Sequence, residues 1–462
     1  MKELPITNLA KILNARILGP KNAQKTCSAV NIDSRTVKPG DCFFAIPGPN
    51  FDGHNFLADA LAKGASCAVV REEIQPNQFP GKTILRVNDT VESLGVLAGW
   101  YRRECNFKVV AITGSVGKTT TRQIVHHVLS HRFKTHQPVK NFNNFIGLPL
   151  SILAASPDHQ ILVLELATNK PGEIEYLSRI AAPDVALVTN VHPAHLAGFG
   201  SIEKIAEEKL SISKGLSPAG TLILNADCQP LLDSSRRLKL AFRNFSCFDE
   251  DADYHIDNLI IGPFKSTFTI DNITVELPLP GRGNVENALA AWSICSALGI
   301  SARDFADAVK TISPLSMRSE LLQIGSLTVI SDCYNANPAS MKNALEILAN
   351  LAGHQKRRAV FVCGDMAELG ESAQIMHRRL GEQIAAAGVR LLITLGNLAA
   401  IAADAARNAS PDLQVRQFTD PAELCDNLHQ LIKDSDIILV KGSRINKLEM
   451  VVQKLKETRN AK

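Results

Sequence analysis

Aromatic residues are scarce in this sequence, and long apolar runs are missing. Phe, Trp and Tyr make up 5% of its 462 residues, which argues against the aromatic stacking platforms that bind single-stranded nucleic acid. No uninterrupted apolar stretch reaches the length of a membrane span. The 50 Lys and Arg barely exceed the 46 Asp and Glu, and no long basic run occurs, so a nucleic-acid-binding surface is not indicated either.

Paired cysteines are also missing. The ten cysteines are scattered singly without any Cys-x-x-Cys, so the sequence indicates neither a zinc cluster nor a redox pair. Several lie in largely apolar runs, as in residues 67–70 and 360–363, which is typical of buried, reduced thiols. Residues 6–13 have the pattern of a capped amphipathic helix rather than of a signal peptide. We therefore expect a protein of the reducing cytoplasm.

The length suggests three domains, since a domain has roughly 150 residues. Three blocks can be distinguished, at residues 1–86, 87–312 and 313–462. The first alternates short strand-like runs with turns, and the other two alternate buried strand-like runs with helical patterns.

These patterns predict an α/β protein. The expected strands of the second and third blocks are residues 108–112, 160–166, 185–190, 221–225, 328–331, 359–363, 391–395 and 437–440. Alternation over residues 247–279 indicates a small antiparallel addition. We expect a small N-terminal α/β domain, a central domain with a parallel sheet, and a C-terminal Rossmann-like α/β domain.

The sharpest motif is a glycine-rich turn between a predicted strand and a predicted helix. Its candidate nucleotide-binding residues are Thr113, Gly114, Ser115, Val116, Gly117, Lys118, Thr119 and Thr120. Glycines let backbone N–H groups close around phosphate oxygens, and the helix N-terminus adds a favourable partial charge. Lys118 can reach the outer phosphates, and the Thr119 hydroxyl can ligate Mg²⁺.

The loop departs from the standard P-loop spacing, because Ile112 stands where the first glycine is usual. An ordinary strand-to-helix turn is the alternative. The coincidence of strand, two glycines, lysine, threonine and helix nevertheless favours nucleotide binding. The central domain is therefore expected to be P-loop ATPase-like.

A companion carboxylate follows the next predicted strand. Glu165 comes after four apolar residues and can hold Mg²⁺ directly or through water. A surface glutamate is the alternative. Neither Asn-Lys pair, at residues 169–170 and 446–447, continues as the Asn-Lys-x-Asp of GTP-binding proteins, which favours ATP.

With these residues in place, the chain resembles the Mur ligases and folylpolyglutamate synthetases, ATP-dependent enzymes that join a carboxylate to an amine. Further motifs match in order: the Asn-rich segment 141–147, Glu165 at the family's Mg²⁺ glutamate, and His195 in its metal-site histidine segment. Lys209 stands where these ligases carry a carbamylated lysine, and residues 281–288 resemble the adenine-side segment.

Motifs in the third block indicate one group within this family. Residues 332–341, 364–370 and 440–444 resemble the Mur ligases whose acceptor is D-alanyl-D-alanine, and the Asp-Asn-Pro-Arg of the diaminopimelate-adding member does not occur. Residues 33–40 and 51–54 resemble the family's uridine-nucleotide domain. This resemblance implies addition of D-alanyl-D-alanine to UDP-N-acetylmuramoyl-tripeptide through an acyl phosphate, for peptidoglycan synthesis. It also implies ATP, two Mg²⁺ ions and a monomeric enzyme.

The resemblance assigns a function to each block and a role to single residues. Residues 1–86 would bind the uridine nucleotide, 87–312 ATP, and 313–462 the incoming dipeptide. The expected catalytic residues are Lys118, His195, Lys209 and Arg318. The expected metal ligands are Thr119, Glu165 and His195. Further nucleotide contacts are expected from Asn284, Asn287, Arg318 and Asp332. The expected substrate-binding residues are Ser34, Arg35, Asp52, Gly53, His54, Asn141, Asn143, Asn144, Tyr334, Asn335 and Asn337.

Plainer interpretations stay open for several of these residues. Lys209 alone has the pattern of a solvated helix lysine, and Arg318 that of a linker arginine. His195 fits an ordinary loop histidine, Tyr334 a core residue, and residues 52–54 a plain turn.

The sequence departs from the family pattern at four positions: Ala167 and Met317 stand for glycine, Gly283 for histidine, and Ser211 for a glutamate two residues after Lys209. A folylpolyglutamate synthetase is one alternative, although that enzyme lacks a separate N-terminal uridine domain. A P-loop switch ATPase is another. An inactive paralogue would be expected to lack Lys118 or Glu165, and both are present.

Overall fold

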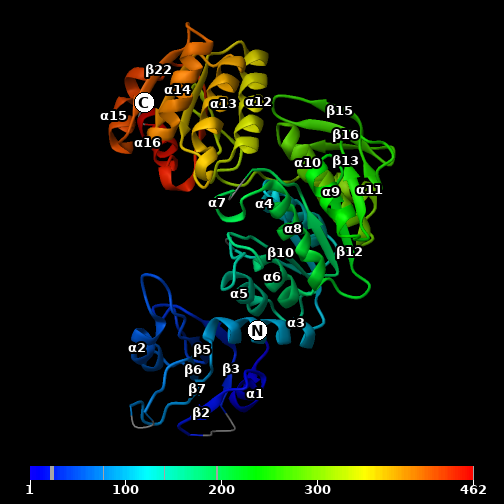
Figure 1. Ribbon diagram of the computed structural model, residues 1–462, viewed down its shortest axis with the longest axis vertical. Helices are drawn as coiled ribbons and strands as arrows, with labels where there is room; N and C mark the ends of the chain where they lie inside the picture. The colour runs from blue at the N-terminus through cyan, green and yellow to red at the C-terminus, as the bar shows by residue number, and fades with distance from the viewer. Residues whose placement is uncertain (21–24, 76–77, 140, 194–195, 461–462) are drawn as a thin grey trace. The chain divides into compact units, whose positions relative to one another are not determined.

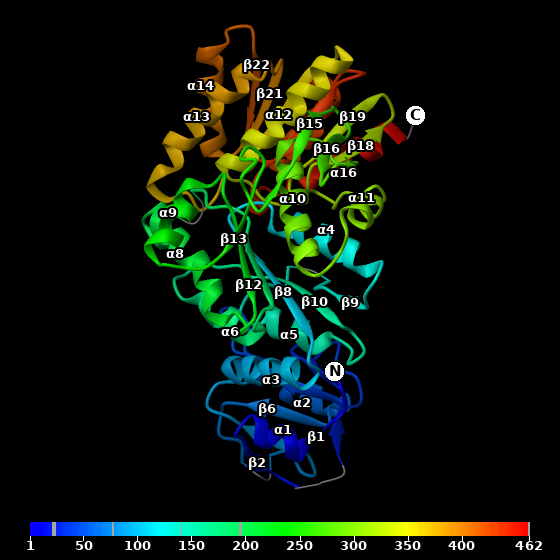
Figure 2. The same ribbon diagram turned by 90° about the vertical axis from the view of Figure 1, so that its right-hand side faces the viewer.

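The computed structural model describes residues 1–20, 25–75, 78–139, 141–193 and 196–460 (Figures 1 and 2). The chain forms two compact units. The first comprises Met1–Thr113, Leu129–Leu187 and Glu208–Ile223, and the second Gly114–Val128, Val188–Glu207 and Leu224–Lys462. Within the described residues, no helix is both long enough and apolar enough to cross a bilayer.

The N-terminal part of the first unit is built on a five-stranded sheet with the order β2-β7-β6-β5-β4. Its strands are β2 (Arg16–Leu18), β4 (Ala29–Asn31), β5 (Asp41–Phe44), β6 (Cys67–Val70) and β7 (Ile84–Arg86). β4 to β7 pair in parallel, and β2 joins β7 antiparallel. Phe43 and Leu61 pack in its core, as expected for a strand and a helix that each bury one face.

Short elements complete this part. They are β1 (Leu4–Pro5), which pairs with β3 (Thr26–Cys27), and the helices α1 (Ile6–Ile12), η1 (Gly53–Phe56), α2 (Leu57–Ala62) and α3 (Thr90–Glu104). Asp89 begins α3, because its carboxylate accepts the N–H groups of Val91 and Glu92 at 2.7 and 2.8 Å. The helix expected over residues 6–13 is confirmed by α1.

The central sheet has seven strands in the order β14-β13-β12-β11-β8-β10-β9. They are β8 (Lys108–Thr113), β9 (Thr135–His136), β10 (Ile161–Glu165), β11 (Val185–Val188), β12 (Thr221–Asn225), β13 (Arg243–Ser246) and β14 (Tyr254–His255). β8 pairs with β10, β9 with β10 and β13 with β14, all in parallel. The non-consecutive order is that of a doubly wound sheet, which confirms the expected class of this domain.

Helices connect these strands. They are α4 (Lys118–Ser130), α5 (Gly147–Ala154), α6 (Glu173–Ala181), α7 (Leu196–Phe199), α8 (Ile202–Leu210), η2 (Ser211–Gly215), α9 (Gln229–Arg237), α10 (Arg282–Ala297) and α11 (Ala302–Val309). The expected antiparallel addition is also confirmed: β15 (Asp257–Ile261), β16 (Ser266–Ile270) and β17 (Ile273–Leu277) form a three-stranded antiparallel sheet.

The C-terminal part holds a six-stranded sheet with the order β18-β19-β23-β20-β21-β22. Its strands are β18 (Glu320–Ile324), β19 (Leu327–Ser331), β20 (Ala359–Gly364), β21 (Leu391–Leu395), β22 (Gln414–Phe418) and β23 (Ile437–Lys441). Its helices are α12 (Pro338–Gln355), η3 (Gly370–Ser372), α13 (Ala373–Ala386), α14 (Asn397–Ala409), α15 (Pro421–Leu431), η4 (Arg444–Asn446) and α16 (Glu449–Asn460). Only β18 pairs antiparallel in the registers of this sheet.

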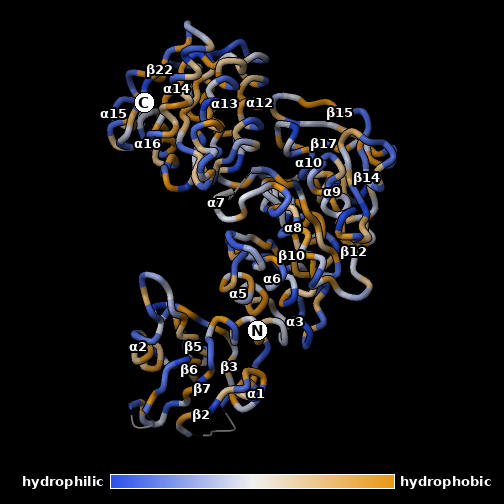
Figure 3. Tube along the Cα trace, in the orientation of Figure 1, coloured by the Kyte–Doolittle hydropathy of each residue, from blue (hydrophilic) through white to orange (hydrophobic). Residues whose placement is uncertain are grey.

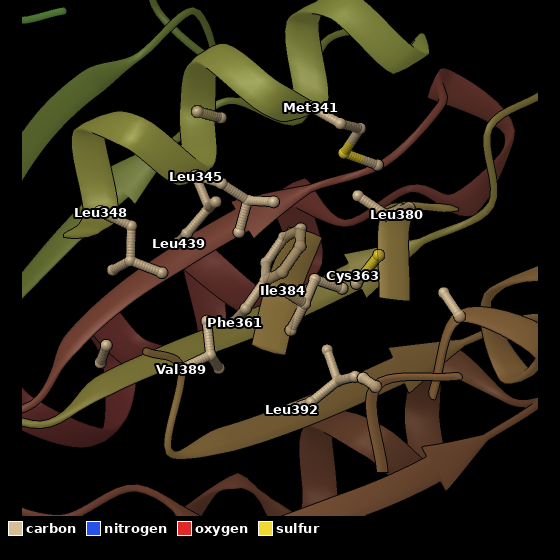
Figure 4. Close-up of a cluster of buried hydrophobic side chains, with 14 of the residues drawn as sticks. Met341, Leu345, Leu348, Phe361, Cys363, Leu380, Ile384, Val389, Leu392 and Leu439 are labelled. Atoms are coloured by element: carbon tan, nitrogen blue, oxygen red, sulfur yellow. The ribbon is translucent and has the colours of Figure 1, made fainter. Parts of the chain in front are cut away.

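Side chains of these strands pack alternately in two separate hydrophobic cores, because successive strand residues point to opposite faces of the sheet. Phe361 and Cys363 of β20 pack with Met341 of α12 and Ile384 of α13 (Figure 4). Val360 and Val362 of the same strand pack on the other face, with residues of α15 and α16. Figure 3 shows apolar segments inside the part of the chain labelled α12 to α16. Helices therefore cover both faces, as expected for a Rossmann-like domain.

The ten cysteines are free thiols, and eight of them are buried. Cys42 and Cys67 are cross-strand neighbours in β5 and β6, with their sulfur atoms 3.5 Å apart. Cys105 and Cys247 are partly exposed. This agrees with the expectation of reduced thiols in apolar surroundings.

Candidate active site

The glycine-rich turn joins β8 to α4, as the sequence predicted. Gly114 and Gly117 have φ angles of 147° and 87°, which residues with a Cβ rarely adopt. A Cβ at Gly114 would overlap Thr189 Oγ1, and a Cβ at Gly117 would overlap Asn287 Oδ1. Both glycines are thus required by backbone conformation and by the close approach of neighbouring side chains.

A second loop, residues 189–192, holds the backbone of this turn in place. Thr189 Oγ1 donates to Val116 O at 2.6 Å, and Asn190 Oδ1 accepts the Val116 N–H at 2.9 Å. The Ser115 N–H donates to Asn190 O at 3.0 Å, and Ser115 Oγ accepts the His192 N–H at 3.0 Å. Two of the amides predicted to bind phosphate are therefore engaged by the protein itself. Thr189 and Asn190 were not predicted as site residues from the sequence, since nothing in the motif marks them.

Polar side chains also gather at the turn. Lys118 Nζ donates to Gly114 O at 2.7 Å, so the ammonium group lies against the loop that it follows. Thr119 is buried. The Thr113 hydroxyl is buried and has no hydrogen-bond partner within the described residues. An orphaned buried hydroxyl and a glycine cradle fit a polar ligand such as a phosphate chain.

Glu165 ends β10 at the carboxyl edge of the sheet. It pairs in register with Ile112, two residues before Gly114. Its side chain is 2% exposed, which excludes the alternative of a surface glutamate. Asn143 Nδ2 donates to Glu165 Oε1 at 2.9 Å, and Asn143 O accepts the Ala167 N–H at 2.9 Å. Asn143 therefore orients the carboxylate. Carboxylate and hydroxyl oxygens are hard donors that suit Mg²⁺, so Glu165 and Thr119 fit that ion by chemistry.

The other asparagines of this segment have different local contacts. Asn144 Oδ1 accepts the N–H groups of Ile146 and Gly147 at 3.2 and 2.9 Å, immediately before α5 and at its first residue. Asn141 O accepts the Asn143 N–H at 3.0 Å. The substrate contacts expected of these residues remain a prediction.

Lys209 lies in the last turn of α8 and is 4% exposed. This burial excludes the alternative of a solvated helix lysine. Lysine is seldom buried without a functional or structural reason. Its predicted partner among the metal ligands, His195, lies outside the described residues.

Helix α10 brings one of its two predicted asparagines to the glycine-rich turn. Asn287 Oδ1 touches Gly117 and accepts the Thr121 hydroxyl at 3.4 Å. Asn284 instead donates from Nδ2 to Pro280 O at 2.8 Å, one turn away. Asn287 therefore lies against the glycine-rich turn, whereas Asn284 bonds within the start of its own helix.

The predicted C-terminal residues come together around a buried ion pair. Arg318 stacks on Tyr334, with 4.4 Å from the guanidinium carbon to the ring centroid. Asp332 Oδ1 accepts the Ser319 N–H at 3.1 Å. Lys441 Nζ donates to Asp332 Oδ2 at 2.7 Å and to Asn335 O at 3.1 Å. Tyr334 is partly exposed, so its interpretation as a core residue is wrong.

No role was predicted for Lys441 itself, although the segment 440–444 that contains it matched a family motif. The signal was present, because a single lysine closes the apolar run of β23. Asn337, which was expected to bind the dipeptide, begins α12: its Oδ1 accepts the Ser340 N–H at 2.9 Å in a capping box.

Replacing Lys441 with methionine is expected to destabilise the C-terminal part strongly. Lys441 is 2% exposed, and its removal leaves the Asp332 carboxylate without its cation. Removing one partner of a buried pair typically costs about 3 kcal/mol or more. Chemical denaturation followed by fluorescence or circular dichroism measures this loss. The double variant K441M/D332N should recover part of the stability, and no recovery would contradict the ion pair as the cause.

The N-terminal candidates form local networks. His54 is 5% exposed; its Nδ1 lies 2.6 Å from Asp52 Oδ1, and its Nε2 accepts the Arg71 N–H at 3.1 Å. These bonds form a turn that fixes residues 52–54. Arg35 is largely exposed and pairs with Asp33 at 2.7 Å, which lowers the pKa of Asp33 to about 2. Ser34 is buried, and its carbonyl accepts from Lys63 Nζ at 2.9 Å.

The contribution of Glu286 of α10 to stability should fall as the pH rises from about 4.5 to 7, because this carboxyl group resists ionisation in the folded protein. Burial, and next the charge of Asp227, raises the pKa of Glu286 to about 7. A raised pKa in the folded state means that unfolding releases a proton in this range, so the unfolded state gains. The contribution of Glu286 is at most about 3 kcal/mol. Glu286→Gln should flatten the apparent melting temperature between pH 5 and 8, and an unchanged pH profile would contradict this assignment.

Comparison with known families covers most of the chain. Residues 26–102 match the catalytic domain of the Mur ligase family, residues 112–295 the Mur ligase middle domain, and residues 317–444 the glutamate ligase domain of Mur ligases.

Individual relatives match over nearly their whole length. The UDP-N-acetylmuramoyl-tripeptide–D-alanyl-D-alanine ligase of Bacillus subtilis is 34% identical over 98% of both chains, and that of Escherichia coli is 33% identical over 99% of both. The crystal structure of MurF from Acinetobacter baumannii superposes with a TM-score of 0.89 at 30% identity, over 99% of both chains. MurF from Thermotoga maritima, solved in complex with ADP, gives 0.82 at 28% identity, over 94% of this chain and 98% of that one.

Proposed function

This chain belongs to the Mur ligase family, and on that premise we propose that it adds D-alanyl-D-alanine to UDP-N-acetylmuramoyl-tripeptide in an ATP-dependent reaction. The product is the pentapeptide precursor of peptidoglycan. One observation carries the proposal: relatives with this activity match the chain from end to end, through all three of its blocks. The buried thiols agree with a reducing cytoplasm as the place of this reaction.

The central block is proposed to activate the tripeptide's carboxylate as an acyl phosphate. A carboxylate and a phosphate chain are both anions, so the site must supply positive charge for them to meet. Lys118 supplies one cation from its place on the glycine-rich turn, and the partial charge of the α4 N-terminus adds to it. Glu165, oriented by Asn143, and Thr119 are proposed to hold Mg²⁺, which neutralises phosphate charge when it is bound.

A second ion near the acyl carboxylate is proposed for His195. Lys209, once carbamylated, would change from a cation to an anionic oxygen donor and support this ion. The burial of Lys209 supports the proposal, because lysine is seldom buried without a functional or structural reason.

The C-terminal block is proposed to bring the dipeptide's amine to the acyl phosphate. Asp332 is proposed to contact ATP, and Arg318 to close over its outer phosphate as a charge-assisted donor. Tyr334 and Asn335, next to the Lys441–Asp332 pair, and Asn337 at the start of α12 are proposed to hold the dipeptide. Residues 1–86 are proposed to bind the uridine diphosphate through Ser34, Arg35 and the turn at residues 52–54.

An omission series tests the proposal. Phosphate release from ATP and Mg²⁺ is measured with UDP-N-acetylmuramoyl-tripeptide and D-alanyl-D-alanine, each left out in turn. We expect release only with both substrates, together with a product heavier by one dipeptide in mass spectrometry. Release with neither substrate would indicate a switch ATPase instead. Release that needs a folate and glutamate would place the chain with the folylpolyglutamate synthetases.

A further inference from the structure

Glu208 is a buried carboxylate next to Lys209, and none of the roles above uses it. It is 7% exposed. Its Oε1 accepts the Ile174 N–H at 2.8 Å and the Thr168 hydroxyl at 3.3 Å, and its Oε2 accepts the Gly172 N–H at 2.7 Å. Each carboxylate oxygen is thus bonded, which is what a charge needs in order to be tolerated in the interior.

All three partners of the Glu208 carboxylate belong to one segment, residues 168–174. This segment follows directly on Glu165 and the two residues after it, and it leads into the first turn of α6. The amides of Gly172 and Ile174 lie at the helix N-terminus, where a carboxylate is favoured by the helix dipole. Glu208 therefore ties the chain that leaves the metal-binding carboxylate to the helix that carries Lys209.

The residues that follow Lys209 contact helix α6 at two more points. Lys214 Nζ contacts Glu175 Oε2 at 2.7 Å, and a Cβ on Gly215 would overlap the backbone of Ser178. Contact between residues 208–215 and α6 thus runs along the helix from its first turn. Glu208 is the buried, ionic end of that contact.

Position 211 connects this observation with the sequence. In the family pattern that the sequence resembles, a glutamate stands two residues after the lysine, and this chain has Ser211 there. Positions 208 and 211 are three residues apart, so they share one face of the helical segment. The Ser211 hydroxyl donates to Glu208 O at 2.6 Å. This chain thus has no carboxylate at position 211, but it has one on the same helical face, one turn earlier, at Glu208.

We infer that Glu208 is a positioning residue for the ligase reaction: its carboxylate fixes Lys209 relative to the segment of Glu165, and it does so in place of a glutamate at 211. The inference rests on the proposed function. Glu208 touches no reacting atom. It acts by holding two predicted metal-site residues at a fixed separation, and a loosened support of this kind typically lowers metal affinity or activity by roughly 10- to 100-fold.

Three variants test the role: Glu208→Ala, the double variant E208A/S211E, and Glu207→Ala as a matched control. Glu207 is the preceding glutamate on the same helix, and it is exposed and pairs with Arg237 at 2.7 Å. We expect Glu208→Ala to lower kcat roughly 10- to 100-fold and to raise the Mg²⁺ concentration for half-maximal rate several-fold. Glu207→Ala should change neither kcat nor the Mg²⁺ requirement. The double variant E208A/S211E should restore most of the kcat and most of the Mg²⁺ affinity lost in Glu208→Ala.

Amide hydrogen exchange separates this inference from the proposed function. In Glu208→Ala, the amides of Gly172 and Ile174 should exchange faster, whatever reaction the protein catalyses. If exchange is faster but the wild type fails the omission series, the proposed ligase function is wrong, whereas the contact of Glu208 with residues 168–174 is confirmed. If kcat falls only in proportion to the folded fraction, with the Mg²⁺ requirement unchanged, Glu208 is merely structural and the inference is overturned. An unrestored double variant would overturn the replacement of position 211.

Discussion

Lys118→Met is expected to reduce substrate-dependent phosphate release by roughly 100- to 1,000-fold, because the site loses its cation at the phosphate chain. Methionine keeps the length and apolar stem of lysine, so the change isolates the charge. Lys118 Nζ already lies 2.7 Å from Gly114 O, and the glycine-rich turn around it is held by Thr189 and Asn190. The loop should therefore keep its conformation in the variant.

The measurement is steady-state phosphate release at saturating tripeptide and dipeptide. Lys134→Met serves as the control, since Lys134 is exposed and its ammonium group pairs with the exposed Asp158 at 3.1 Å. The control should retain full activity. If Lys118→Met keeps the wild-type rate and still requires ATP, Lys118 takes no part in the mechanism. The assignment of the turn as the phosphate-binding site would then be wrong as well.

Lys209→Ala is expected to lose most ligase activity, roughly 100-fold, while nucleotide binding survives. The loss follows if a carbamylated Lys209 supplies an anionic oxygen donor, because alanine leaves that position without one. Short carboxylic acids such as formate or acetate should then restore part of the rate by occupying the space of the carbamate.

Lys204→Ala is the matched control, because Lys204 is an exposed lysine on the same helix, α8, five residues before Lys209. It should stay active and show no response to added carboxylate. Nucleotide binding is followed by fluorescence or calorimetry with ADP and Mg²⁺. Full activity in Lys209→Ala would refute the carbamate assignment, and an equal loss of nucleotide binding would assign the lysine to the ATP site instead.

The parts of the site that the sequence predicted are those in which the chemistry lies in a short stretch of chain. The turn from Thr113 to Thr120 and the carboxylate at the end of β10 can be found in the sequence, because in each case an apolar strand run changes abruptly to glycine or polar residues. Lys441 and Glu208 were not found in this way. Their partners lie far along the chain, 109 residues away for Lys441 and 34 to 40 residues away for Glu208, so only the folded structure shows what they bind.

The fold followed the same rule. The buried strands β20, β21 and β23 were predicted closely, because burial on both faces leaves a continuous apolar run. The strands β18 and β22 were missed. They lie at the two edges of the sheet, and β22 reads Gln-Val-Arg-Gln-Phe, with polar side chains that face water. Such edge strands carry a weak signal, because pairing with a single neighbour rather than burial defines them.

The arrangement of the thiols makes the protein a convenient host for chemical labelling. Eight cysteines are sheltered from solvent, and burial raises the pKa of the two partly exposed ones, Cys105 and Cys247, so few thiolates are available at neutral pH. A maleimide dye should therefore react slowly with the native chain. A cysteine introduced on an exposed helix would react far faster, so a pair of dyes can be attached to chosen blocks without first removing the natural thiols.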